Sequence, residues 1–202
     1  MDQGEEPDAT RDEQGDGWDV MTSSKAKRIS KISADIARIE KSFFRSDDPD
    51  LRQRYYELQR KREHLLRSII LELHLSIENI ITGAIGNELL QGRLIRSPAG
   101  HAIRDLLEDD HALGFRHKLL LARSLNLITR AEFTDLAELN TVRNRCSHNW
   151  QLNKVTRRKL TPSKAKKPIL RFRGTNLYQT DAFLKFVGLF SKHYLKLFLR
   201  LA

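Results

Sequence analysis

The sequence has little of what marks many common protein classes. It holds one cysteine in 202 residues, which excludes an intrachain disulfide and fits a reducing cytoplasm. It has no phosphate-binding glycine loop, dinucleotide fingerprint or serine-nucleophile elbow, so it does not match the enzyme classes that these motifs define. His101, His111 and His117 lack the paired spacing of metal ligands on one helix. We therefore predict neither a metal nor a cofactor.

A long uninterrupted apolar run is also missing. The most apolar stretch, 65–85, is broken by Arg67, Glu72, His74 and Glu78. A bilayer-spanning helix needs ~20 mostly apolar residues, so we predict no membrane span. The acidic, polar N-terminus does not resemble a secretory signal. These absences together predict a cytoplasmic location.

The net charge of +10 is unevenly distributed. Residues 1–22 hold eight acidic residues against Arg11 and carry −7, which leaves +17 for the rest. From Arg143 onward there are fifteen lysines or arginines and a single acidic residue, Asp181. Such an imbalance predicts an anionic partner, and nucleic acid is the commonest one. The alternative is a basic surface that serves only solubility.

Apolar residues at steps of three and four predict an all-α, up-and-down bundle of about five to six helices. A disordered acidic tail is expected over 1–22 and a single helical domain over 23–202. The expected parts of this domain are an N-terminal helix over 23–50 that begins near Ser24, core helices and a motif over 51–150, a basic loop over 151–179, and a terminal helix over 180–202.

Local signals place several boundaries inside this domain. Asp48 and Pro49 are typical of a helix start. The long helix that follows is expected to kink or break near Gly83 and Gly86, because a glycine inside a helix costs ~1 kcal/mol relative to alanine. Within the basic loop, residues 169–173 are predicted to form a short strand that Gly174 ends.

The clearest helix start lies at Thr129. The pattern Thr129-Arg-Ala-Glu132 is a capping box, and Ile128 and Phe133 occupy the two positions of a hydrophobic staple. The helix that begins here carries Phe133 and further apolar residues on one face and runs directly into the segment 143–148. A separate helix is predicted before it, from Phe115 to about Leu127.

The segment 143–148 concentrates groups that can do chemistry. At ~100° per residue, Asn140, Asn144 and His148 form one polar stripe, while Arg143 lies ~140° from His148. Cleaving RNA without a metal needs a base, an acid and positive charge at the phosphate, which histidine and arginine supply. Because one chain offers one such histidine, two copies are expected to share a groove across a two-fold axis.

This segment resembles the Arg-x4-6-His motif of the HEPN superfamily (higher eukaryotes and prokaryotes nucleotide-binding domains). The residues from 115 to 142 are similar to the approach to that motif in prokaryotic HEPN families, including those similar to the mannitol operon repressor. The resemblance covers 51–202 as a fold and 115–150 closely. It implies a dimeric helical bundle whose catalytic members are metal-independent endoribonucleases, in this case a toxin or defence effector.

Carried over by position, the resemblance puts Arg143 and His148 in the catalytic places and Asn144 in the polar place after the arginine. Ser147 departs from the pattern, since many relatives have a small or aromatic apolar residue there. Many relatives also carry an acidic residue on an early helix, and both Glu72 and Glu78 are candidates.

RNA phosphates are expected to bind basic residues near this motif. These are Arg145, Lys154, Arg157, Arg158 and Lys159. The other expected partners are a second copy of the chain and an antitoxin or regulatory protein.

Several alternatives stay open. The cations of 143–148 would also stabilise a helix C-terminus through its dipole, by ~0.3–1 kcal/mol. The basic loop would also serve as a solvated loop, and Cys146 is interpreted as a packing residue rather than a nucleophile. The alternative functions are a non-catalytic HEPN-like regulator that binds nucleic acid or protein, and a purely structural helical adaptor.

Overall fold

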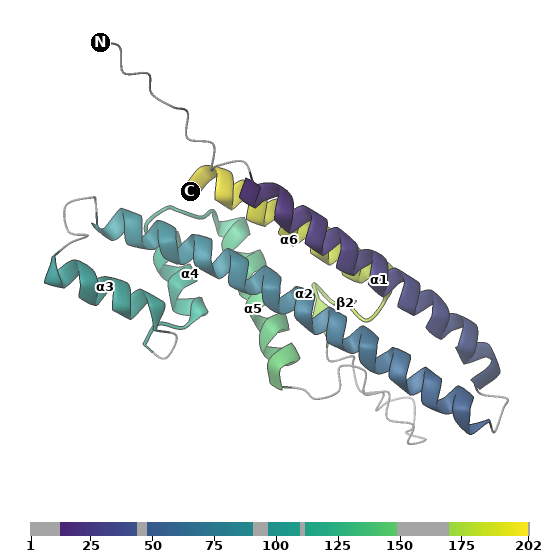
Figure 1. The fold of residues 1–202 in the computed structure, drawn as a ribbon. Coiled ribbons are helices and arrows are strands. Elements are labelled where there is room, and N and C mark those ends of the chain that lie inside the picture. The colour runs from purple at the N-terminus through teal and green to yellow at the C-terminus, as the bar shows by residue number, and fades with distance from the viewer. Residues whose placement is uncertain (1–12, 44–47, 91–96, 110–111, 149–169, 202) are drawn as a thin grey trace, which may run out of the picture.

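The structure is a computed structural model, and it describes residues 13–43, 48–90, 97–109, 112–148 and 170–201. Within these residues six helices pack together (Figure 1), which confirms the predicted all-α bundle. The helices are α1 Glu13–Phe43, α2 Pro49–Leu90, α3 Pro98–Glu108, α4 Phe115–Ser124, α5 Arg130–His148 and α6 Thr180–Leu201. A two-stranded antiparallel hairpin, β1 Arg171–Phe172 and β2 Thr175–Asn176, precedes α6.

Helix α2 is the centre of the bundle. It begins where the sequence predicts, with the Asp50 amide donating to Asp48 Oδ1 at 2.9 Å, and its 42 residues span ~63 Å. It contacts α1, α3, α4, α5 and α6. The predicted break at Gly83 and Gly86 is wrong, since the helix runs through both glycines. Burial of the neighbouring Ile85 against the bundle offsets the small propensity cost of the glycines.

Length and composition alone would also allow α2 to cross a membrane, and half of its most apolar stretch is buried inside the protein. The central helix of a helical bundle has the same composition, because it is covered by neighbours on several sides.

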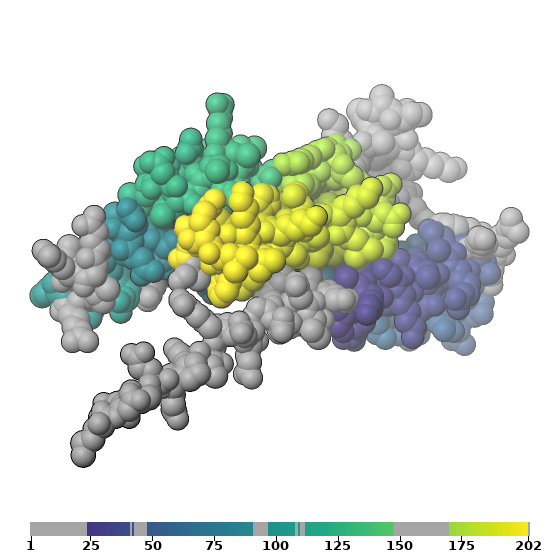
Figure 2. Space-filling model, turned by 90° about the horizontal axis from the view of Figure 1, so that it is seen from above, coloured from purple at the N-terminus to yellow at the C-terminus, as the bar shows by residue number. Residues whose placement is uncertain are grey.

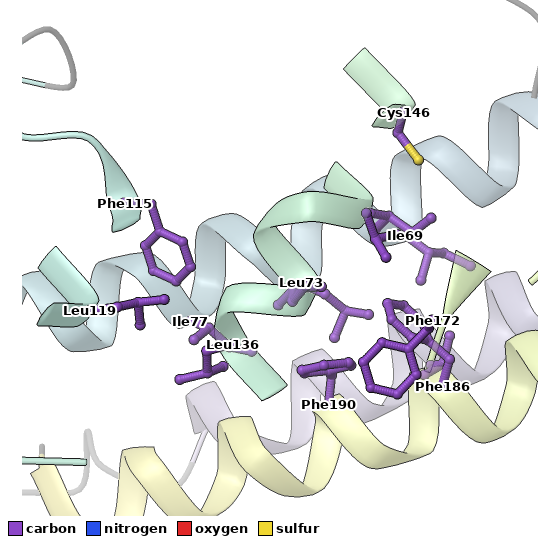
Figure 3. Packing of buried hydrophobic residues seen from close by; sticks show 14 of the residues in the cluster. Ile69, Leu73, Ile77, Phe115, Leu119, Leu136, Cys146, Phe172, Phe186 and Phe190 are labelled. Carbon is purple, nitrogen blue, oxygen red and sulfur yellow. The ribbon is translucent and has the colours of Figure 1, made fainter. Parts of the chain in front are cut away.

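The core forms where α2, α5 and α6 meet, with α4 and the hairpin closing its ends (Figure 3). Figure 2 shows the molecule from above, with α6 (yellow) in the middle. Helices α4 and α5 (green) lie on one side of it, and α1 (purple) lies on the other. Aromatic rings dominate the α6 side, where the Phe172 ring meets those of Phe186 and Phe190 edge-on at 5.1 and 5.4 Å. Such pairs add ~0.5–1.5 kcal/mol beyond the area that they bury.

Some boundaries differ from the sequence-based predictions. Helix α1 begins at Glu13, eleven residues before the expected Ser24. The rest of the predicted tail, 1–12, lies outside the described residues. Helix α4 ends at Ser124, three residues early, because Asn126 adopts a left-handed conformation with φ 59°.

The predicted strand over 169–173 is confirmed in part, since β1 covers only Arg171–Phe172 and is ended by a tight turn at Arg173 and Gly174, while residue 169 lies outside the described residues. Arg173 and Gly174 both have positive φ, 48° and 78°, as a two-residue hairpin turn of type I′ requires. The Arg173 side chain donates to Asp135, and its backbone amide donates to Glu138. The hairpin is therefore anchored on α5 rather than projecting from it.

The distal end of the α1–α2 hairpin extends past the other helices (Figure 1). No side chain in the range 49–61 of α2 is buried, whereas Arg62 is only 7% exposed. At that point the Arg62 guanidinium lies 4.4 Å from the centre of the Tyr178 ring and donates to Thr180 Oγ1 at 3.2 Å. These contacts mark the edge of the packed bundle on α2.

The start of α5 forms the predicted capping box. The Thr129 amide donates to Glu132 Oε2 at 2.7 Å, and the Glu132 amide donates to Thr129 Oγ1 at 3.2 Å. Ile128 is 1% exposed and Phe133 packs against the core, as expected of a staple. Lys196 and Arg200 of α6 add ion pairs to Glu132 at 3.1 and 3.2 Å.

This cap should make stability depend on pH. Desolvation by burial raises the pKa of Glu132, but hydrogen bonds from Thr129, Arg200 and Lys196 outweigh it and lower the pKa to about 2 from 4.5. The contribution is complete above about pH 4.5 and is lost as the pH falls through about 2. Between pH 5 and 2 the free energy of unfolding should fall by up to about 3 kcal/mol more in the wild type than in Glu132→Gln. Urea unfolding at each pH measures this, and parallel curves would contradict it.

Candidate functional site

The last turn of α5 carries the side chains that the sequence singles out. Arg143 and Asn144 are both half-buried, and Arg143 Nη1 donates to Asn144 Oδ1 at 3.0 Å. Arg143 Nε is buried and has no hydrogen-bond partner among the described residues. The Ser147 hydroxyl donates back to the Arg143 carbonyl at 3.1 Å. The Arg143 guanidinium is thus held by Asn144 through Nη1, whereas its Nε–H group makes no hydrogen bond within the described residues.

A second helix contributes to this turn. Arg67 of α2 donates from Nη1 to the Cys146 carbonyl oxygen at 2.6 Å, which satisfies one of the carbonyl groups that every helix C-terminus leaves without a partner. With the half-buried Arg143 and the exposed Arg145, three arginines surround the final turn. An anion at this end of the bundle would meet concentrated positive charge.

A buried polar network lies one turn earlier on α5. His74 of α2 is 1% exposed, with Nε2 at 3.2 Å from Asn140 Oδ1 and Nδ1 at 3.4 Å from Glu78 Oε2. Glu78 pairs with Lys118 of α4 at 2.9 Å, and both are buried. The Phe115 ring meets the His74 ring at 4.4 Å. The network joins α2, α4 and α5, and it fixes the position of α5 along the axis of α2.

The two acidic candidates on α2 differ in what they contact. Glu72 pairs with Lys25 of α1 and accepts a hydrogen bond from Ser68 at 2.7 Å, so these contacts connect it to α1 and to its own helix. Glu78 reaches Asn140 of α5 through His74. Of the two, Glu78 has the connection to the motif helix.

The other predicted site residues are placed as follows. His148 is the last residue of α5, so the helix does run through the whole motif, but the His148 side chain lies outside the described residues. The predicted phosphate-binding residues of the basic loop also lie outside them, namely Lys154, Arg157, Arg158 and Lys159. Within the described ranges, no three His, Cys, Asp or Glu side chains are grouped as a metal would require.

Arg67 and His74 were not assigned to the site from the sequence. The signal that could have found them is the interruption of the apolar stretch 65–85. A polar side chain within an otherwise buried helix costs free energy unless it has a partner. Arg67, His74 and Glu78 are all such interruptions, and each of them has its partner on α4 or α5.

Cys146 lies within the motif but is buried, at 1% exposure. Its side chain is turned toward α2 near Ile69 (Figure 3). Burial raises the pKa of the Cys146 thiol to about 12, against a smaller lowering effect of Arg67. A thiol of this kind is a packing residue, because the thiolate is the nucleophile.

Alkylation tests this interpretation. We expect iodoacetamide at pH 8 to modify Cys146 about a thousandfold more slowly in the native protein than in urea, because both access and the thiolate fraction are low. Mass spectrometry over time gives the two rates. Similar rates in the two states would show that the thiol is exposed and ionisable.

Comparison of the chain with protein-family models finds no match, and neither do comparisons with curated proteins and with solved structures.

Proposed function

We propose that this protein is a metal-independent endoribonuclease of the HEPN type, a toxin or defence effector that acts as a homodimer. The observation that carries the proposal is the last turn of α5, where Arg143 contacts Asn144, Arg67 of α2 donates to the Cys146 carbonyl oxygen, and the helix ends at His148. Arg143 is half-buried and is oriented by its 3.0 Å hydrogen bond to Asn144, as suits a group that must be positioned for a phosphate. RNA is the substrate class that fits this charge and chemistry.

The reaction would need no component besides RNA. A base takes the proton of a ribose 2′-hydroxyl, and the 2′-oxygen attacks the adjacent phosphorus. The bond from phosphorus to the 5′-oxygen breaks, and an acid protonates that oxygen, which leaves a 2′,3′-cyclic phosphate and a 5′-hydroxyl. The His148 residues of two copies would act as base and acid, while Arg143 stabilises the charge on the phosphate.

Dimerisation is part of this proposal. Arg143 and His148 are ~140° apart on a straight helix, so one copy of α5 does not present both groups to one phosphate. With a two-fold axis beside α5, Arg143 of one copy and His148 of the other could act on the same phosphate.

The test is incubation of end-labelled single-stranded RNA with the full chain in EDTA. We expect cleavage products that carry a 2′,3′-cyclic phosphate, and no cleavage of the same sequence made as DNA, which lacks the 2′-hydroxyl. An absence of RNA cleavage, or equal cleavage by His148→Ala, would overturn the proposal.

A regulator that binds nucleic acid without cutting it is the second candidate. The half-buried Arg67 and the exposed Arg145 favour it, because they place charge for a phosphate without requiring His148. In that case Arg143→Ala should weaken RNA or DNA binding in a gel-shift assay while no strand is cut by either protein.

A further inference from the structure

We propose that the face of α2 formed by Tyr56, Arg60, His64 and Arg67 binds single-stranded RNA beyond the end of α5. We name this face the α2 track. The proposal rests on the proposed function for its choice of RNA as ligand, and it adds the surface along which the strand would run.

The first step is the direction of α5 along α2. Arg67 contacts Cys146, and His74, seven residues later, lies at 3.2 Å from Asn140, six residues earlier. The two helices therefore run antiparallel in this region. Because α5 ends at His148, the part of α2 before Arg67 extends past the motif.

The second step is which side chains this extension presents. At 100° per residue, positions 56, 60, 64 and 67 fall within an arc of about 80° and cover about 16 Å of helix. Tyr56 is 62% exposed, Arg60 and His64 are exposed, and Arg67 is half-buried against α5. The α2 track is therefore one continuous face that starts at the motif and leads away from it.

The third step is the chemistry of the ligand. An exposed aromatic ring in line with cations is the arrangement that proteins use for single strands, because the ring stacks on a base and the cations bind phosphates. Two acidic residues flank this arc, the half-buried Glu63 on one side and the exposed Glu57 on the other, each about 20° from the nearest residue of the track. The cations within the arc are Arg60 and Arg67, and a duplex, whose bases are already stacked, would not use Tyr56.

The experiment measures binding separately from cleavage. The probe is a fluorescein-labelled, 2′-O-methylated single-stranded RNA of mixed sequence, which has no free 2′-hydroxyl and so is not cut. Fluorescence anisotropy at several salt concentrations gives the affinity and its salt dependence for the wild-type chain and each variant. A duplex of the same length is measured alongside.

We expect Tyr56→Ala to weaken single-strand binding at least about fivefold, while Tyr56→Phe keeps the ring and retains affinity. Arg60→Gln should lower the slope of log affinity against log salt by about 0.7, the value for one phosphate contact on a single strand. The matched control is Arg54→Gln, an exposed arginine on the same helix that lies about 120° from Arg60. It should change neither quantity.

The outcomes separate the two proposals. Wild-type affinity in Tyr56→Ala together with an unchanged salt slope in Arg60→Gln overturns the α2 track, whether or not the protein cuts RNA. Equal weakening of duplex binding by Tyr56→Ala also overturns it. Loss of single-strand binding in these variants of a protein that never cuts RNA supports the track and overturns only the catalytic proposal. Absence of RNA binding by the wild type overturns both.

Discussion

Alanine at position 148 is expected to lower the rate of RNA cleavage in EDTA by a factor of about 10² to 10⁴, the usual contribution of a positioned general acid or base. The reason is that His148 is the group of the motif whose unperturbed pKa of ~6.5 allows it to accept and donate a proton near neutral pH. Rates come from single-turnover assays with end-labelled RNA. RNA binding should be retained, since the arginines are unchanged.

The matched control is His101→Ala. His101 is exposed on α3, which lies apart from the last turn of α5 (Figure 1), so its loss should leave the cleavage rate unchanged. Equal rates for the wild type and His148→Ala would show that a different group, or a contaminant, does the chemistry. Retained circular dichroism and the same oligomeric state are needed for either result to count.

Lys118→Met should destabilise the protein by about 3–5 kcal/mol, because it leaves Glu78 buried without its cation. Lys118 and Glu78 are 3% and 5% exposed and lie 2.9 Å apart, so water does not replace the lost partner. Urea unfolding of the wild type and the variant gives the difference. This is a large share of the ~5–15 kcal/mol that holds an ordinary protein folded.

A double variant provides the control for this prediction. Replacing Glu78 and Lys118 together by methionine removes both charges, and replacing a buried ion pair by apolar residues is often close to neutral. The double variant should therefore be more stable than Lys118→Met alone. Glu78→Met completes the cycle. If the loss of stability in the double variant equalled the sum of the losses in Lys118→Met and Glu78→Met, the two residues would not act as a coupled buried pair.

The parts of the fold that the sequence predicts well are those with strong local chemistry. The capping box at Thr129 and Glu132, the start of α2 at Asp48 and Pro49, and the turn at Gly174 each follow from which backbone groups a side chain can satisfy or which φ a residue can adopt. These features depend on neighbours within a few residues.

The sequence-based predictions are wrong where contacts between residues far apart in the sequence determine the structure. The helix break expected at Gly83 and Gly86 does not occur, because the helix that contains them is packed on several sides. The buried network is also a matter of tertiary structure. No local rule pairs His74 with Asn140, which is 66 residues away in the sequence, although a histidine within an apolar stretch already signals that a partner is needed.

The geometry around the candidate site could be predicted from the sequence only where it depends on helical spacing. Helical spacing places Asn140 and Asn144 on one stripe, and both are half-buried, as a seam between helices requires. Helical spacing cannot show which helix faces that stripe, and it therefore does not predict that Arg67 of α2 contacts Cys146 of α5.

The distal α1–α2 hairpin gives the molecule two levels of local stability. Amide hydrogens in the middle of α2, where Leu66 to Ile85 includes many fully buried residues, should exchange with solvent only through global unfolding. Those over 49–61, where no side chain is buried, can exchange through fraying of the helix pair alone. A segment that opens at low cost can adjust to ligands of different shape, while the core that holds Arg143 in place stays closed.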